Sequence, residues 1–140
     1  MKRTMMLLVV LCLSLAVACS KSYGDVKAFL QKMTASMETF LSNIEKAQSA
    51  SETATAMNKL CDDMESFTKE AEELKKKYPE LGKETPSALK TEMDKLQEVS
   101  TRFQGPALRD KLMKFASDET VQSAAMRMVK VGNAMQMLGN

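Results

Sequence analysis

The chain has 140 residues, of which 44% are hydrophobic and 27% are charged, with 20 basic and 18 acidic side chains. This composition is typical of one globular domain and not of a disordered or wholly membrane-embedded chain. The absence of histidine excludes a Ser-His-Asp or Cys-His catalytic unit and a His-ligated zinc or haem site.

The first 18 residues have the layout of an export signal. Lys2 and Arg3 precede an apolar run that begins at Leu7 and ends in the small residues Ala16-Val17-Ala18. The uncharged stretch is shorter than the roughly 20 residues that a bilayer-spanning helix needs. We therefore expect residues 1–18 to be removed as a signal, residues 19–22 to form a short tether, and residues 23–140 to form the domain.

The end of this signal contains Leu15-Ala16-Val17-Ala18-Cys19, which resembles the lipobox of bacterial lipoproteins. The resemblance implies cleavage before Cys19 and acylation of that residue, so that a lipid holds the domain to the membrane on its periplasmic side. The sequence departs from the family's pattern at Ala16, where leucine is commonest. In Gram-negative lipoproteins an aspartate after the cysteine marks inner-membrane retention, and Ser20 in its place favours the outer membrane. The alternative is simple secretion after Ala18, whose small residues also fit an ordinary cleavage site.

Loss of the signal changes both the charge and the supply of cysteines. Without Lys2 and Arg3 the 20 basic residues become 18, equal to the acidic count, so a nucleic-acid partner loses its electrostatic support. Cys12 leaves with the signal and Cys19 would carry lipid, which leaves Cys61 as a free thiol and permits no intramolecular disulfide. Cys61 follows the apolar Leu60 and is interpreted as a small buried hydrophobe.

Apolar spacing in the rest of the chain predicts two long helices first. Ser22 with Asp25 has the form of a capping box and predicts a helix to about Gln48, and Ser49 with Glu52 predicts a second helix to about Tyr78. The expected inward side chains of the first helix are Val26, Phe29, Leu30, Met33, Met37, Phe40, Leu41, Ile44 and Ala47. Those of the second are Met57, Leu60, Met64, Phe67, Ala71, Leu74 and Tyr78.

The second half of the chain predicts three further helices after a loop from Pro79 to Glu84. Thr85 is expected to cap the third helix and Pro86 to be its first residue, and Gly105-Pro106 ends it. Its inward side chains are Leu89, Met93, Leu96, Val99 and Phe103. A short helix around Leu108, Leu112 and Phe115 leads to a last helix, capped at 117–119, with inward Val121, Ala125, Met128, Gly132, Met135 and Leu138. The sequence therefore predicts an all-α, up-and-down bundle of four main helices plus a short connecting helix.

Methionine is unusually frequent, with 13 in the chain. Most of the methionines after the signal fall on the predicted inward faces and are interpreted as core. Met126 and Met137 instead fall on the outer side of the last helix with Lys130 and Asn133, and they are a candidate contact patch for a partner or for the membrane surface. The small residues Ala124, Ala125 and Gly132 predict a close approach of that helix to a neighbour.

Two other features invite a functional reading. Asp62, Asp63 and Glu65 are interpreted as a solvated acidic face, because no Glu-x-x-His pair accompanies them. Met37-Glu38-Thr39 followed by 44–47 resembles the first helix of the soluble periplasmic b-type cytochromes, where this methionine is an axial haem ligand. That family's second ligand is a histidine near the C-terminus, which this chain lacks, so the resemblance implies a helical bundle without haem.

The sequence contains no glycine-rich phosphate loop and no nucleophile elbow. It therefore predicts a non-enzymatic, lipid-anchored envelope protein without cofactor or metal, which acts through contacts with an unidentified protein partner in a structural, adaptor or chaperone-like role. The alternative is an extracytoplasmic carrier that binds Cu(I) or an apolar ligand between its Met-rich helices.

Overall fold

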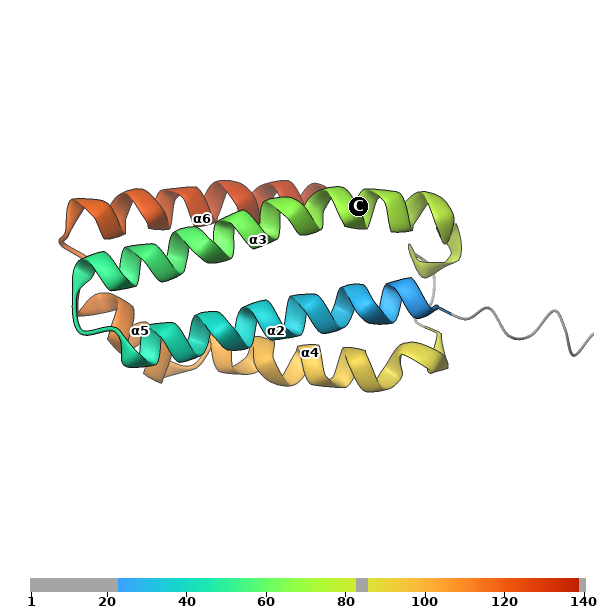
Figure 1. Ribbon diagram of the computed structural model, residues 1–140, viewed down its shortest axis with the longest axis horizontal. Coiled ribbons are helices and arrows are strands. Elements are labelled where there is room, and N and C mark those ends of the chain that lie inside the picture. Colours follow the sequence, from blue (N-terminus) through green and yellow to red (C-terminus); the bar gives the residue numbers. More distant parts are fainter. Residues whose placement is uncertain (1–22, 83–85, 139–140) are drawn as a thin grey trace, which may run out of the picture.

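The computed structural model describes residues 23–82 and 86–138, and within them every regular element is helical. The elements are α2 (Gly24–Lys46), α3 (Ala50–Lys77), the 3-10 turns η1 (Pro79–Gly82) and η2 (Ser87–Leu89), α4 (Lys90–Phe103), α5 (Pro106–Met113) and α6 (Glu119–Leu138). The four long helices run alternately up and down, and the short α5 connects α4 to α6 (Figure 1). The predicted all-α bundle is confirmed. The predicted signal, Cys19 and Ser22 lie outside the described residues.

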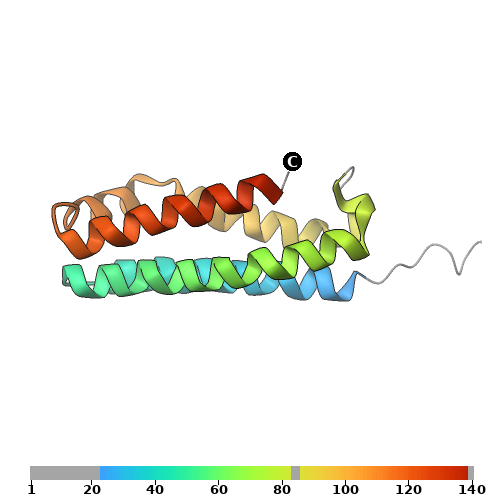
Figure 2. The ribbon, with the colours of Figure 1, turned by 90° about the horizontal axis from the view of Figure 1, so that it is seen from above.

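The helices form two layers, one with α2 and α3 and one with α4, α5 and α6 (Figure 2). α3 packs along both α2 and α6, and α2 packs along α4, whereas α4 and α6 hardly contact each other. α6 also ends short of the C-terminal end of α3 (Figure 2). The bundle is consequently open along one side, between α4 and α6.

The turn between α2 and α3 is closed by the predicted capping box. Ser49 has an extended backbone, and its hydroxyl accepts a hydrogen bond from the backbone N–H of Glu52 at 3.2 Å. The carboxylate of Glu52 accepts in turn from the backbone N–H of Gln48 at 2.7 Å. α2 ends at Lys46, two residues before the predicted end, because Ala47 has already left the helical conformation. Capping satisfies donors that the helix itself leaves free, which fixes the hairpin.

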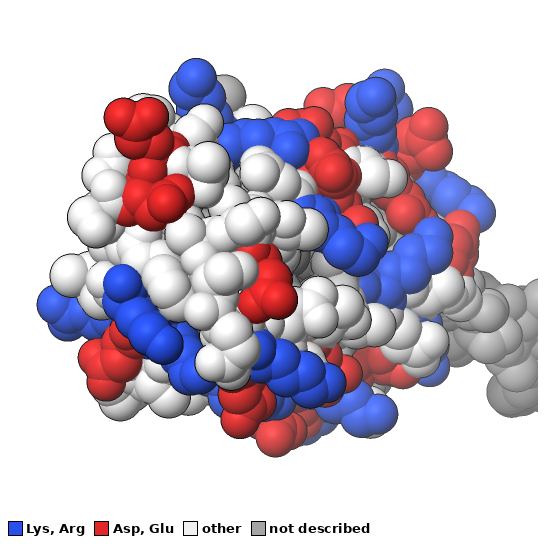
Figure 3. Space-filling model, turned by 60° about the vertical axis from the view of Figure 1, so that its left-hand side comes forward, with Lys and Arg blue, Asp and Glu red and all other residues white. Residues whose placement is uncertain are grey.

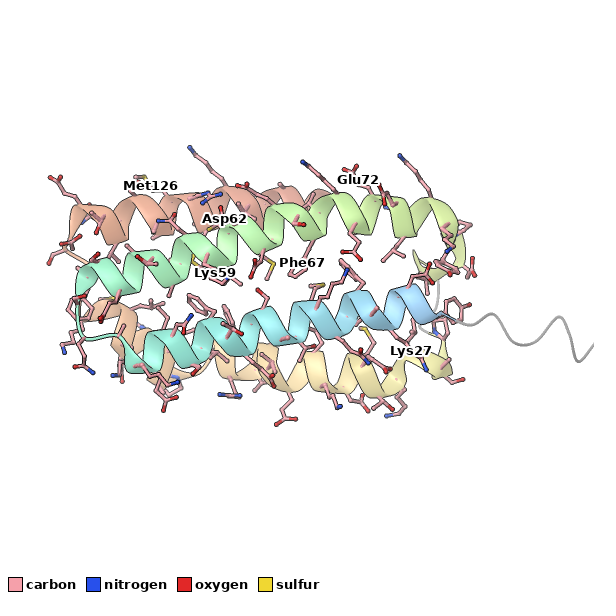
Figure 4. The ribbon with its side chains drawn as sticks, viewed as in Figure 1. Lys27, Lys59, Asp62, Phe67, Glu72 and Met126 are labelled. Atoms are coloured by element: carbon pink, nitrogen blue, oxygen red, sulfur yellow. The ribbon has the colours of Figure 1, made fainter. Side chains whose placement is uncertain are left out.

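Two connected clusters of buried side chains form the core. The first surrounds Phe40, Ile44, Met57 and Leu60, and the second surrounds Val26, Phe29, Leu30, Phe67, Tyr78 and Leu89. Phe40 stacks on Phe103 of α4 with 5.0 Å between ring centroids, and Phe29 meets Phe67 edge-on at 5.9 Å. Figure 4 shows Phe67 pointing from α3 toward α2. Every one of these residues that belongs to the first two helices was predicted to face inward, and that prediction is confirmed.

The start and the face of the third helix differ from the prediction. Pro86 has an extended backbone and precedes the turn η2, so α4 begins at Lys90 and Pro86 is not its first residue. The turn carries Leu89 into the second cluster, where it is 2% exposed. Met93 was expected to face inward and is 38% exposed, because α4 is covered by α2 on one side and hardly meets α6 on the other.

The buried face of α6 is also rotated from the predicted one. Val121 is buried as expected, but Ala124 and Val131 are buried where Ala125 and Gly132 were predicted. Ala124, one of the small residues predicted for a close approach, is 1% exposed and belongs to the first cluster. Gly132 is exposed, and a Cβ added there would meet no atom within 4 Å, so it serves no close approach. The side chains of Met135 and Leu138 are outside the described ones.

Polar contacts fasten the start of α2 to the end of α3. Lys77 forms an ion pair with Asp25, and the hydroxyl of Tyr78 donates a hydrogen bond to the Asp25 carboxylate at 2.8 Å. The rings of Tyr23 and Tyr78 lie 5.3 Å apart, and the hydroxyl of Tyr23 donates to Glu80 at 3.3 Å. Tyr23 is the N-cap of α2, with no side-chain capping bond. These contacts join the residues that follow the predicted tether to the end of α3.

Candidate functional site

The opening between α4 and α6 forms an apolar groove of about 350 Å³, here named the α4–α6 groove. Five of its lining side chains carry sulfur, namely Met33 and Met37 from α2, Cys61 and Met64 from α3, and Met128 from α6. The other lining residues are Leu60, Leu96, Ser100, Phe103, Val131 and Gly132. None of these residues is charged. A pocket of this size lies at the lower end of the range found for small-molecule sites.

Helical spacing explains why the sulfur atoms gather in one place. Met33 and Met37 are four residues apart, and Cys61 and Met64 are three apart, so each pair lies on one side of its helix. Met37 and Cys61 are buried, whereas Met33, Met64 and Met128 are half-buried. Their interpretation as core is therefore confirmed for Met37, while the half-buried methionines border an open groove. Periodicity identifies the inward side of a helix, but it does not reveal whether another helix fills the space there.

Cys61 is the most reactive group in the groove by residue type, yet its surroundings suppress that reactivity. The residue is 1% exposed, and burial raises the pKa of its thiol, with the carboxylates of Glu65 and Asp62 acting in the same direction. Arg127 opposes this shift but does not outweigh the burial. A thiol with a raised pKa stays neutral and is a poor nucleophile. The interpretation of Cys61 as a small buried hydrophobe is confirmed.

The candidate contact patch is described in part. Met126 is 63% exposed and lies at the outer side of α6, away from the core (Figure 4). Val129, three residues further on, is also 63% exposed, and the apolar spacing argument did not identify it as an outward residue. Met137 belongs to α6, but its side chain is outside the described ones. The outer face of α6 therefore has two exposed apolar side chains near each other.

The acidic cluster on α3 is solvated as predicted, with the Asp62 and Glu65 side chains 66% and 54% exposed, and it also connects helices. The Arg127 guanidinium on α6 donates to Asp62 at 2.7 Å and to Glu65 at 3.0 Å. The hydroxyl of Ser36 on α2 donates to Asp63 at 2.6 Å. These partners are distant in sequence, and local charge patterns do not identify them. Among the described residues no group of three or more Cys, Asp or Glu side chains is arranged to hold a metal ion.

A second hollow, of about 410 Å³, lies between α2 and α5. Leu41, Ile44 and Leu108 form its apolar part, while Glu45, Arg102 and Lys111 place charges along it. The Lys111 ammonium already donates to the backbone carbonyl of Glu45 at 2.9 Å and so ties α5 to α2. We regard this hollow as part of the helix junction and the α4–α6 groove as the candidate site.

Charges of both signs are interspersed on the end of the molecule that carries the α2–α3 turn, α5 and the start of α6 (Figure 3). No protein-family model, no curated protein and no solved structure matches the chain. Across residues 23–82 and 86–138, no helix has both the length and the hydropathy that crossing a bilayer requires. The features that bear on function are therefore the groove, the exposed residues of α6 and the N-terminal sequence.

Proposed function

We propose that this chain is a lipid-anchored, non-enzymatic binding protein of the bacterial cell envelope, which holds an apolar ligand in the α4–α6 groove. The groove carries the proposal. Its lining combines three half-buried methionines with aliphatic and aromatic side chains and no charge, and flexible thioether side chains adapt to ligands of irregular shape.

The chemistry of the groove favours binding over catalysis. Among its described lining residues, the groups with chemical reactivity are the Ser100 hydroxyl and the Cys61 thiol. A hydroxyl needs an adjacent base to act as a nucleophile, and no carboxylate or amine lines the groove beside it. Burial keeps the thiol neutral by raising the pKa of Cys61. We therefore expect a bound apolar ligand to be released without chemical change.

The N-terminal sequence supports a location at the membrane. With the signal removed before Cys19, three residues separate the acylated cysteine from Tyr23, a span of about 14 Å at most. The domain then stays next to the bilayer, on the periplasmic side and, given Ser20, at the outer membrane. Simple secretion after Ala18 is the competing location.

The anchor is tested with Cys19→Ala in the full chain. The wild-type protein should partition into detergent and show a mass increment from its acyl chains, because each buried methylene adds about 0.8 kcal/mol to membrane binding. The variant should lack the increment and keep its signal or be cut elsewhere. An unmodified N-terminal Cys19 on wild-type protein that is released without detergent would replace the lipid anchor with simple secretion.

The ligand is tested on the chain from residue 19, with Cys19 replaced by Ser and an ordinary export signal in front of it, purified without detergent. Both buried clusters lie after residue 25, so this chain keeps all of their described members. We expect organic extraction and mass spectrometry to recover about one apolar molecule per chain. Stoichiometric copper with no organic ligand would favour a Cu(I) carrier using the groove's sulfur atoms.

A second candidate function is contact with a protein partner through the outer face of α6, and it is favoured by the exposure of Met126 and Val129. Exposed apolar side chains close together are typical of contact sites, although single ones are ordinary. We expect Met126→Ser with Val129→Ser to abolish cross-linking to an envelope protein in cells. The matched control is Gln122→Ala on the same helix, and equal cross-linking of all three proteins would contradict this function.

A further inference from the structure

We infer that the α4–α6 groove takes one long acyl chain of a free fatty acid, with the carboxylate left outside. This inference rests on the proposed function and names the class of its ligand. Three features of the groove support it, namely its volume, the chemistry of its lining and its continuation toward the end of the bundle where α2 begins.

The volume of the groove suits a narrow ligand. A three-turn helix about 16 Å long and about 10 Å wide occupies roughly 1,200 Å³, whereas the groove offers about 350 Å³. The groove is also much larger than a single metal ion requires. A single flexible chain fits between these limits, and the methionines on opposite sides can adjust to it.

The lining of the groove favours a hydrocarbon chain over a charged group. The Ser100 hydroxyl and the buried Cys61 thiol are the polar groups among the described lining side chains. The other lining residues are apolar or, at Gly132, have no side chain. A carboxylate placed among these residues would lose its hydration without gaining a cation. The charged end of an amphiphile must therefore stay in water, and its chain can enter alone.

The apolar surface continues from the groove toward the start of α2. Met33, Met64 and Leu96 line the groove and also pack against the second buried cluster, which includes Phe29 and Phe67. All three are half-buried. α6 ends at Leu138, short of the end of α3, so its described residues leave this part of the other three helices uncovered (Figure 2). A long chain can lie along this surface and enter the groove from its open end.

This open end lies at the end of the bundle where α2 begins, next to the residue at which the proposed tether joins the domain (Figure 2). Met33 lies nine residues after Gly24, which is about 14 Å along α2. Cys19 lies five residues before Gly24, at most about 18 Å away, so Met33 is within about 32 Å of Cys19. A fatty acid leaving the bilayer next to the anchor therefore has a short, apolar path to the groove.

The test uses the detergent-free chain from residue 19 with Ser at that position, after extraction of any bound lipid, titrated with palmitate by calorimetry. We expect saturable binding of one palmitate per chain. Gly132 lines the groove and has open space at its Cβ, so Gly132→Leu adds a bulky side chain to the groove wall, and Ser100→Leu adds one from the α4 side. Each should raise the Kd about tenfold or more, while the exposed control Asn133→Leu on α6 should stay within about twofold of wild type.

Circular dichroism of each variant separates a blocked groove from an unfolded protein. Folded wild-type chain that does not bind palmitate, or a folded Gly132→Leu variant that binds it as tightly as wild type, would overturn the inference. Cu(I) binding that displaces palmitate and is lost in Met33→Leu would assign the groove to a metal. If the chain with Ser at position 19 binds palmitate but Cys19 of the wild-type protein is found unacylated, this inference stands and the anchor is removed from the proposed function.

Discussion

Individual polar side chains stabilise this bundle by linking helices whose charges are far apart in sequence. Arg127 joins α6 to two carboxylates of α3, and Asp25 joins the start of α2 to Lys77 and Tyr78 at the end of α3. The hydrogen bond from Lys77, and then that from Tyr78, lowers the pKa of Asp25 from its ordinary 3.8 to about 2. Surface ion pairs of this kind contribute little each to the free energy of unfolding.

The lowered pKa of Asp25 predicts part of the acid sensitivity of the fold. Because the folded chain holds the Asp25 proton more weakly than the unfolded chain, the contribution of Asp25 is fully present above about pH 4 and is lost as the pH falls toward 2. Asp25→Asn cannot ionise. We expect the free energy of unfolding of wild type to fall more than that of the variant over this interval, as measured by urea titration at each pH. Parallel losses in the two proteins would mean that the contact is absent.

At the scale of the helix, spacing and capping decide where each element begins and which side it buries. α3 begins after Ser49 as its capping box predicts, and Asp118 accepts from the backbone N–H of Thr120 at 2.9 Å at the start of α6. The hydrogen bond from the Thr120 hydroxyl, and then this backbone bond, lower the pKa of Asp118. The sequence specifies the buried face of α6 less well, because the residues at 124, 125 and 132 are all small. Two adjacent faces are therefore possible, the predicted one with Ala125 and Gly132 and the observed one with Ala124 and Val131.

The effect of Gly132→Ala on the stability of the fold distinguishes these two faces of α6. Gly132 is helical and exposed, and an added Cβ meets no atom within 4 Å, so alanine should stabilise the fold by about 0.5–1 kcal/mol through its higher helix propensity. Thermal unfolding checks this prediction. The control is Gly105→Ala, whose Cβ would lie 3.1 Å from the Arg102 carbonyl oxygen and which should bring no gain. Destabilisation by Gly132→Ala would mean that α6 is rotated toward the predicted face.

For the molecule as a whole, the buried clusters must hold four helices together although one side of the bundle is open. Leu60 is 4% exposed, belongs to the first cluster and also faces the groove. The neighbouring Cys61 packs at 1% exposure without a disulfide, so the fold depends on packing at this level. A change at Leu60 therefore tests the core, and a probe of Cys61 tests how often the core opens.

Leu60→Asp should lower the free energy of unfolding by about 3 kcal/mol or more, because it buries an unpaired carboxylate in an apolar cluster. The measurement is urea unfolding followed by circular dichroism. Met126→Asp is the matched control on an exposed position and should change the free energy by no more than about 0.5 kcal/mol. A near-wild-type melting temperature for Leu60→Asp would mean that Leu60 does not lie on the buried face of α3.

Labelling of Cys61 should report opening of the whole molecule. In a chain with Ser at position 19, a thiol reagent should modify Cys61 slowly at neutral pH, because the side chain is buried and the pKa of its thiol is raised. The rate should increase in denaturant and in the Leu60→Asp variant. Immediate labelling of the folded wild-type chain would show that Cys61 is accessible through the groove.

Sequence by itself determined the helical class, the order of the helices, the α2–α3 capping box and most inward positions of the first two helices, because these depend on spacing and on local hydrogen bonds. Tertiary structure decided the rotation of α6, the exposure of Met93, the partners of Asp62 and Glu65, and the collection of five sulfur-bearing side chains around one groove. Each of these depends on which helices meet and how closely they approach. Periodicity marks the apolar side of a helix, but the distance between α4 and α6 follows from packing among all the helices, and that distance creates the groove.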